Sequence, residues 1–125
     1  MPLPIQLSAA RTTETPAASM HTYASPTTTP AAPISVWRTE MAPDATGPVH
    51  SIDVTHVVVV LAGRLDATVD GHEVRATPGD CVVLDAGVAR QLAAGPEGVV
   101  TVTAAPAGSR AVAGAAEPVT VPWAN

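Results

Sequence analysis

Short valine-rich runs separated by glycine and proline constrain the fold of this chain most strongly. The 125 residues contain no Phe, two Trp and one Tyr, so a core must be built mainly from Val, Leu, Ile and Ala. β-Branched residues favour strands, whereas Gly and Pro mark turns. No segment shows a long helical period, and the length allows one modest core. We therefore predict a single all-β domain.

Composition divides the chain near residue 33. Residues 1–33 are rich in Pro, Thr and Ala with little apolar periodicity, and such a segment is disordered by default. From residue 34 to 125, strands and turns alternate in the manner of a sandwich or barrel. If packing instead holds the N-terminal arm, the expected anchors are Leu3, Ile5, Leu7, Met20 and Tyr23.

Turn signals separate the strands that the sequence predicts in the second part. Between two of them, Asp70-Gly71 is a two-residue hairpin signal that requires a positive φ at Gly71. The expected strands are 34–41, 49–61, 64–69, 72–76, 81–84, 88–93 and 99–104.

The charge pattern argues against several classes of partner. The net charge is −5, Lys is absent and the six Arg residues are scattered, so no basic stripe is present to contact phosphates or anionic lipids. The single Cys81, expected to be a small buried apolar residue, allows no internal disulfide. With no leader or spanning run expected, we predict a cytoplasmic protein without nucleic acid or membrane partners.

Two short motifs resemble those of the cupin family. The first family motif is Gly, five residues, His-x-His, three or four residues, Glu, six residues, Gly. Here it closes at Gly63, with His56 at the Glu position and His50 and Ile52 at the two His positions. The resemblance covers about residues 34–125 and implies a jelly-roll barrel, the cupin double-stranded β-helix.

The second family motif is Gly, five residues, Pro-x-Gly, two residues, His, three residues, Asn. Here Arg90 replaces the His. The other positions read Gly79, Asp85, Gly87 and Ala94. The fifteen residues between Gly63 and Gly79 are a spacing similar to that of compact microbial cupins.

The resemblance supports the fold more than metal chemistry. Cupins normally hold a metal with three His and one Glu, and the four positions here read His50, Ile52, His56 and Arg90. A guanidinium cannot be a ligand because it stays protonated and has no lone pair to donate. We therefore expect no metal cofactor, with Zn or Fe at His50 and His56 as the weaker alternative.

Strand periodicity alone predicts a pocket containing the same polar residues. Side chains two apart share a face of a strand, and the face that carries His50 and His56 is otherwise apolar. Arg90 shares its face with Val88 and Leu92. We predict that His50, His56 and Arg90 point into one cavity. The predicted apolar wall is Ile52, Val54, Val58, Val83, Val88 and Leu92.

Three functions fit such a pocket. The first is an enzyme that isomerises, cyclises or eliminates from a small oxygenated molecule, including a polyketide-like chain, by non-redox acid/base chemistry. His50 and His56 would transfer protons and Arg90 would hold a carboxylate or enolate. The second is a non-catalytic cupin that binds a small ligand. The third is a metal-dependent oxygenase, in which His50 and His56 would be joined by Asp44, Asp53 or Glu40.

Two further expectations concern an alternative position of Arg90 and the oligomeric state of the protein. Arg90 could instead reach the barrel rim and pair with Asp85 or Glu97. Because barrels of this kind expose sheet edges that tend to be covered, we also predict a homodimer, with the N-terminal arm crossing to the partner.

Overall fold

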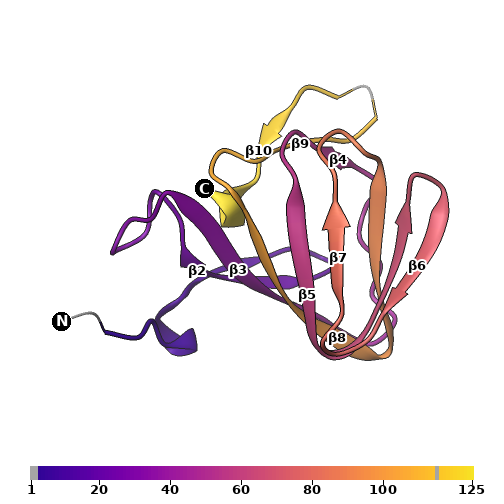
Figure 1. The fold of residues 1–125 in the computed structure, drawn as a ribbon, viewed down its shortest axis with the longest axis horizontal. Helices are drawn as coiled ribbons and strands as arrows, with labels where there is room; N and C mark the ends of the chain where they lie inside the picture. Colours follow the sequence, from indigo (N-terminus) through magenta and orange to yellow (C-terminus); the bar gives the residue numbers. More distant parts are fainter. Residues whose placement is uncertain (1–2, 115) are drawn as a thin grey trace.

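The computed structural model describes residues 3–114 and 116–125, and their regular elements are strands apart from two short 3₁₀ turns (Figure 1). No helix in these two ranges is long and apolar enough to cross a membrane. The elements in chain order are η1 (Leu7–Ala9), β1 (Arg11–Glu14), β2 (Ser19–Ala24), β3 (Ile34–Met41), β4 (Ser51–Ile52), β5 (His56–Val69), β6 (His72–Ala76), β7 (Cys81–Leu84), β8 (Arg90–Pro106), β9 (Arg110–Val112), β10 (Val119–Thr120) and η2 (Pro122–Ala124).

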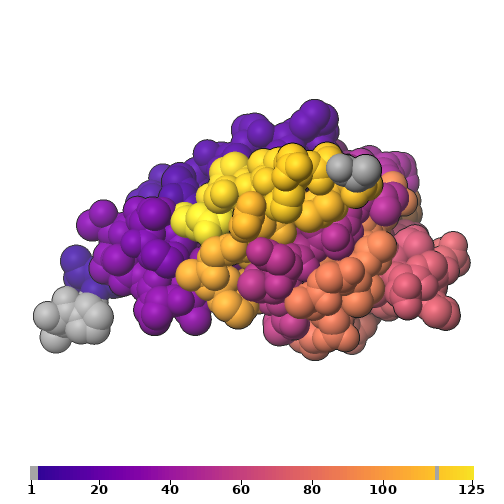
Figure 2. All heavy atoms as spheres, turned by 90° about the horizontal axis from the view of Figure 1, so that it is seen from above, coloured from indigo at the N-terminus to yellow at the C-terminus, as the bar shows by residue number. Residues whose placement is uncertain are grey.

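Two long strands, β5 and β8, organise the barrel. They pair antiparallel along almost their whole lengths, from Val57 opposite Ala104 to Val69 opposite Arg90. The first half of β5 also pairs with β7 and its second half with β6, so the strand takes part in both sides of the barrel. This is the jelly-roll barrel that the sequence predicts. The small sheet β10-β9-β4 lies at one end, where the C-terminal segment covers the surface (Figures 1 and 2).

Glycine permits the bend at which the two long strands turn together. The register shifts on either side of Gly63, and both Gly63 and Gly98 have a positive φ, at 74° and 81°. A Cβ on Gly63 would lie 2.1 Å from the carbonyl oxygen of Gly98. The two backbones can approach this closely only because Gly63 has no side chain, while a Cβ on Gly98 would lie 2.8 Å from the Met41 carbonyl oxygen of the neighbouring chain segment.

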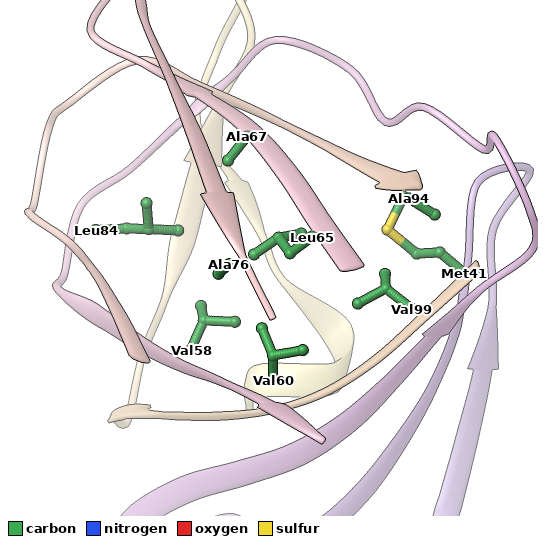
Figure 3. Packing of buried hydrophobic residues seen from close by; sticks show 9 residues of the cluster. All are labelled: Met41, Val58, Val60, Leu65, Ala67, Ala76, Leu84, Ala94 and Val99. Carbon is green, nitrogen blue, oxygen red and sulfur yellow. The ribbon is translucent and has the colours of Figure 1, made fainter. Parts of the chain in front are cut away.

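The barrel interior is aliphatic, as the absence of Phe requires. Figure 3 shows its core side chains converging from β3, β5, β6, β7 and β8. The strand periodicity is correct for Val58 and Val60, which are buried here. It fails for Ile52 and Val54, because the chain leaves the strand at residues 53–55. These two side chains pack instead into a second cluster with Met20, Trp37, Ala105, Val121 and Ala124.

Residues 11–24 extend the main sheet, so the expectation of disorder does not hold for them. β2 pairs with β3, and β1 pairs with β2. Of the expected anchors Met20 is buried and Tyr23 is partly buried, whereas Leu3 is 82% exposed, and Ile5 and Leu7 are exposed as well.

Hydrogen bonds to the C-terminal segment replace the missing apolar anchors. Thr22 donates to the carbonyl of Trp123 at 2.7 Å. Ser25 and Arg11 donate to the carbonyl oxygen of Asn125 at 3.0 and 2.8 Å. Hydroxyl side chains of this Thr- and Ser-rich segment therefore hold it in place by hydrogen bonds. A prediction based on apolar residues alone does not detect such anchors.

The predicted hairpin turn is confirmed. Val69 pairs with His72, and the two residues between them have positive φ values, 50° at Asp70 and 77° at Gly71. The strands expected at 34–41, 72–76 and 81–84 are present with those bounds, while the expected 64–69 strand is the second half of β5 and the expected 88–93 and 99–104 strands merge into β8. Cys81 is exposed rather than buried.

We expect Gly63→Ala to destabilise the protein more than Gly71→Ala. Both substitutions place a side chain at a positive φ, which costs about 1–2 kcal/mol. At Gly71 the new Cβ meets no atom within 4 Å, whereas at Gly63 it meets backbone. Urea unfolding of the two variants measures the difference, and equal losses would show that the Gly63–Gly98 approach is not what fixes the bend.

Candidate functional site

A cavity of about 60 Å³ lies inside the barrel, and the structure brings His50, His56 and Arg90 together in its lining. Val58 and Leu92 from the predicted wall are also present. The remaining lining residues come from β3, β5, β7 and β8, and they are Trp37, Thr39, Met41, Leu65, Leu84, Thr101 and Thr103.

The other four predicted wall residues lie elsewhere. Ile52 and Val54 belong to the second cluster, and Val88 lies outside the cavity lining. Val83 is 56% exposed because it pairs with Val57 on the outer face, and this register turns its neighbour Leu84 inward opposite His56. The missed residues Trp37, Thr39 and Met41 follow period two along the predicted strand 34–41, so that strand's own periodicity was the available signal.

Arg90 is buried in this lining, and no acidic side chain of residues 3–114 and 116–125 forms an ion pair with it. It is 1% exposed, and it donates through Nε to the Val88 carbonyl at 3.1 Å and through Nη2 to the Asp85 backbone carbonyl at 2.7 Å. The third nitrogen, Nη1, is buried with no hydrogen-bond partner among the described residues. A rim ion pair with Asp85 or Glu97 is therefore wrong. Burial lowers the pKa of Arg90, partly offset by the charge of Asp85.

Backbone pairing fixes His50 beside Arg90. The two residues exchange both backbone hydrogen bonds, at 2.9 and 2.8 Å. Gly47 donates to the Leu92 carbonyl at 2.9 Å, so the segment before β4 runs alongside the start of β8. His50 reaches the cavity through this irregular segment rather than from a long strand, which explains how the expected residue appears without the expected strand.

His56 is a neutral imidazole in a dry position. It is 7% exposed, its Nε2 lies 3.0 Å from the hydroxyl of Ser109, and the Trp37 ring packs edge-on at 5.1 Å. The pKa of His56 is lowered to about 4, mainly by burial and also by the positive charge of Arg90 and, when it is protonated, of His50, with Asp53 opposing. At neutral pH this side chain carries no charge.

Hydrogen-bond partners distinguish the two histidines. Nδ1 of His50 lies 2.9 Å from the Pro48 carbonyl, which can only accept, so His50 carries a hydrogen on Nδ1, and in its neutral form the lone pair is on Nε2. Among the described residues the side-chain hydroxyl of Ser109 contacts only Nε2 of His56, and the direction of this bond depends on which nitrogen of His56 carries the hydrogen. The His50 ring is thus oriented by a pure acceptor, and the His56 ring by a hydroxyl that both donates and accepts.

The residues present do not fit a protein-bound metal of the kind cupins hold. Ile52 has no donor atom, Arg90 stays protonated, and no three His, Cys, Asp or Glu residues of the described chain lie close enough together to share an ion. None of the three carboxylates considered as a further ligand lines the cavity. Asp53 caps the backbone of Arg110, Glu40 contacts His21, and Asp44 is exposed.

The low pKa of His56 predicts a stability change between pH 6.5 and 4. In this window the unfolded residue binds a proton that the folded residue does not, so the free energy of unfolding falls as the pH is lowered. A pKa of about 4 against 6.5 corresponds to about 3 kcal/mol over that range. Urea unfolding at several pH values should show the advantage of wild type over His56→Gln shrinking toward pH 4. A constant difference would contradict the assignment of a neutral, desolvated imidazole.

Several solved structures share this fold. The polyketide cyclase RemF from Streptomyces resistomycificus superposes with a TM-score of 0.70 at 19% identity, covering 85% of this chain and 80% of its own. A sugar phosphate isomerase of the cupin superfamily from Silicibacter pomeroyi gives 0.72 at 16% identity, covering 91% and 83%. KdgF from Halomonas sp. gives 0.69 at 16% identity, covering 85% and 94%. At these identities the likeness concerns the fold.

A family comparison agrees with the fold. No curated protein matches the chain. The model of the cupin domain matches residues 37–104, which is more than half of the sequence. The matched region runs from the cavity-lining Trp37 to the end of the β5–β8 pairing, and it includes His50, His56 and Arg90. The chain therefore belongs to the cupin family.

Proposed function

We propose that this cupin binds a small carboxylate-bearing molecule at Arg90 and carries out non-redox acid/base chemistry on it. One observation carries the proposal, namely a buried guanidinium with an unpartnered Nη1 and no acidic side chain bonded to it. An uncompensated buried cation costs several kcal/mol. An oxyanion in the cavity would offset that cost, because charge-assisted bonds from a guanidinium to a carboxylate are among the strongest available.

The two histidines take different roles in this proposal. His50 is the base, since its Nε2 lone pair is free and the Pro48 carbonyl stabilises the imidazolium that forms. In the tautomer with its hydrogen on Nδ1, the neutral His56 accepts from Ser109 and donates to an oxygen on which charge develops. A proton removed from a carbon next to a carbonyl would pass to His50. Its return to another atom of the same molecule completes an isomerisation, whereas loss of a hydroxide or other leaving group from the neighbouring carbon completes an elimination.

The volume of the cavity favours a short substrate. About 60 Å³ accommodates a few water molecules or a molecule of a few non-hydrogen atoms. A polyketide-like substrate, one of those expected from the sequence, would bind only if the barrel widened. The alternative function, a non-catalytic receptor for the same kind of small acid, rests on the same Arg90 and does not need His50.

We expect Arg90→Met to abolish carboxylate binding without unfolding the protein. Titration of acetate and glycolate into ¹⁵N-labelled protein, followed by NMR shifts of residues lining the cavity, detects even millimolar affinity. Because Met fills similar space without a buried charge, the variant should be as stable as wild type or more stable when no ligand is present. Arg75→Met is the matched control, since it removes the same charge from a side chain that is 72% exposed. Unchanged binding in Arg90→Met would overturn the proposal.

Exchange of carbon-bound substrate protons with the solvent distinguishes an enzyme from a receptor. In D₂O an enzyme of this kind should catalyse exchange of the methyl protons of pyruvate, which are next to a carbonyl, and ¹H NMR follows their loss. His50→Gln should remove the exchange while leaving binding in place. Binding without catalysed exchange, in wild type as in His50→Gln, would favour the receptor.

We also propose that the expected homodimer forms through the outer face of β7, β5 and β8. Outward side chains there are apolar and aligned across strands, with Val83, Val57 and Ala104 in one row. Val83 and the nearby Leu61 are 56% and 47% exposed. Because β2 of the N-terminal arm pairs with β3 of its own chain, we place the contact between the two subunits on this apolar face and not on the arm.

Charge at the border of the same face suits a second copy related by a two-fold axis. Arg38 and Glu40 lie beside it on β3, where Nε of Arg38 is 3.5 Å from the Glu40 carboxylate of the same chain. In a two-fold arrangement the same pair of the second copy would lie opposite, with the basic residue of one copy facing the acidic residue of the other. The apolar rows and this charged border support another copy of this chain as the occupant.

The combined substitution Leu61→Asp and Val83→Asp should convert the dimer to a monomer. Two carboxylates buried per subunit would not be compensated by any cation in the apolar rows. Light scattering at micromolar concentration measures the mass. Val119→Asp is the control, because Val119 is 63% exposed on the other sheet. A wild-type monomer would disprove the dimer, and a doubly substituted dimer would disprove this face.

A further inference from the structure

We infer that the ligand of this cavity carries a hydroxyl or carbonyl oxygen in addition to its carboxylate, and that three threonines bind it. The inference rests on the proposed function and narrows it to short hydroxy and oxo acids. Thr39, Thr101 and Thr103 supply the hydroxyl groups that line the cavity, beside the polar side chains of His50, His56 and Arg90 and the indole of Trp37. We call these three residues the threonine wall.

Strand register gathers the threonine wall in one place. Thr39 on β3 pairs directly with Thr101 on β8, and Thr103 follows two residues later on the same face of β8. Thr101 and Thr103 are buried, at 4% and 5% exposure, between Thr39 or Trp37 on one side and the aliphatic residues of β5 on the other. Three hydroxyls therefore lie side by side on an inner face where aliphatic residues would pack at lower cost.

The hydroxyls of the threonine wall are free to bind a ligand. None has a hydrogen-bond partner among the described residues, and none is a fully enclosed atom, because the enclosed side-chain atoms without a partner in the described chain are nitrogens of Arg38 and Arg90. The threonine oxygens therefore keep some accessible surface, and all three residues line the cavity. A Thr hydroxyl that bonded a nearby backbone carbonyl would have a purely structural role, and these three do not.

The polar groups of the cavity match two ends of one small molecule. A guanidinium binds a carboxylate, while hydroxyls both donate and accept and so suit an alcohol or carbonyl oxygen. A fatty acid would leave the hydroxyls unpaired, and a sugar or alcohol without an acid group would leave Arg90 unpaired. Within about 60 Å³ a 2-hydroxy or 2-oxo acid of two to four carbons satisfies both ends.

Matched pairs of acids test the inference. Glycolate is acetate with one added hydroxyl, and lactate has the same relation to propionate. We expect the wild type to bind the hydroxy acid of each pair at least tenfold more tightly than its partner, by NMR titration. Thr101→Val keeps the shape and removes the hydroxyl, so it should reduce the preference to within about threefold without weakening acetate binding. Thr101→Ser should restore it.

The outcomes separate this inference from the proposed function. If acetate and glycolate bind wild type equally and Thr101→Val changes neither, the threonine wall is not a binding element, while carboxylate binding at Arg90 stands. If no acid binds at all, the proposed function fails and this inference fails with it. Thr68→Val is the control, because Thr68 is an exposed residue of β5 outside the cavity lining, and it should leave both affinities unchanged.

Discussion

The antiparallel pairing of β5 with β8 determines the remaining structure. These two strands supply both sides of the barrel, and every other strand of the main sheet joins one of them directly or through β3. Their common bend depends on Gly63 and Gly98, whose backbones approach more closely than any side chain allows. The two strands also supply much of the cavity, since β5 and β8 carry His56, Arg90 and both buried threonines.

The charge of Arg90 gives the cavity its chemical character. In an interior built from valine, leucine and alanine, a guanidinium without a carboxylate is the least stable feature, and it is held by two backbone carbonyls from the turn before β8. The same turn therefore fixes the cation and leaves one of its nitrogens for a ligand. The positive charge of Arg90 and the burial of His56 both keep His56 neutral, so the charge state of each polar residue in the cavity depends on the others.

The sequence predicts the elements and the polar centre better than the walls. Period-two patterns and Gly or Pro turns identify β3, β6 and β7 with their bounds, and the glycine framework of the family resemblance brings His50, His56 and Arg90 together. Ile52 and Val54 were misplaced because nothing in an apolar run marks where it leaves the strand. Val83 was misplaced because inward and outward faces are both apolar here, so composition cannot decide the register. The threonine wall was missed because threonine is common on strands for other reasons.

The long-range nature of the β5–β8 pairing has a consequence for how the protein acquires its structure. Val57 pairs with Ala104, 47 positions along the chain, so this contact forms only after a long loop has closed. The local hairpin of β5 and β6 can form first and present one edge of β5 to the arriving β8. A slip of one residue in that docking step would turn the inward residues of one strand outward. It would move Arg90, Thr101 and Thr103 to the surface together, so correct registration during folding and formation of the binding cavity are one event.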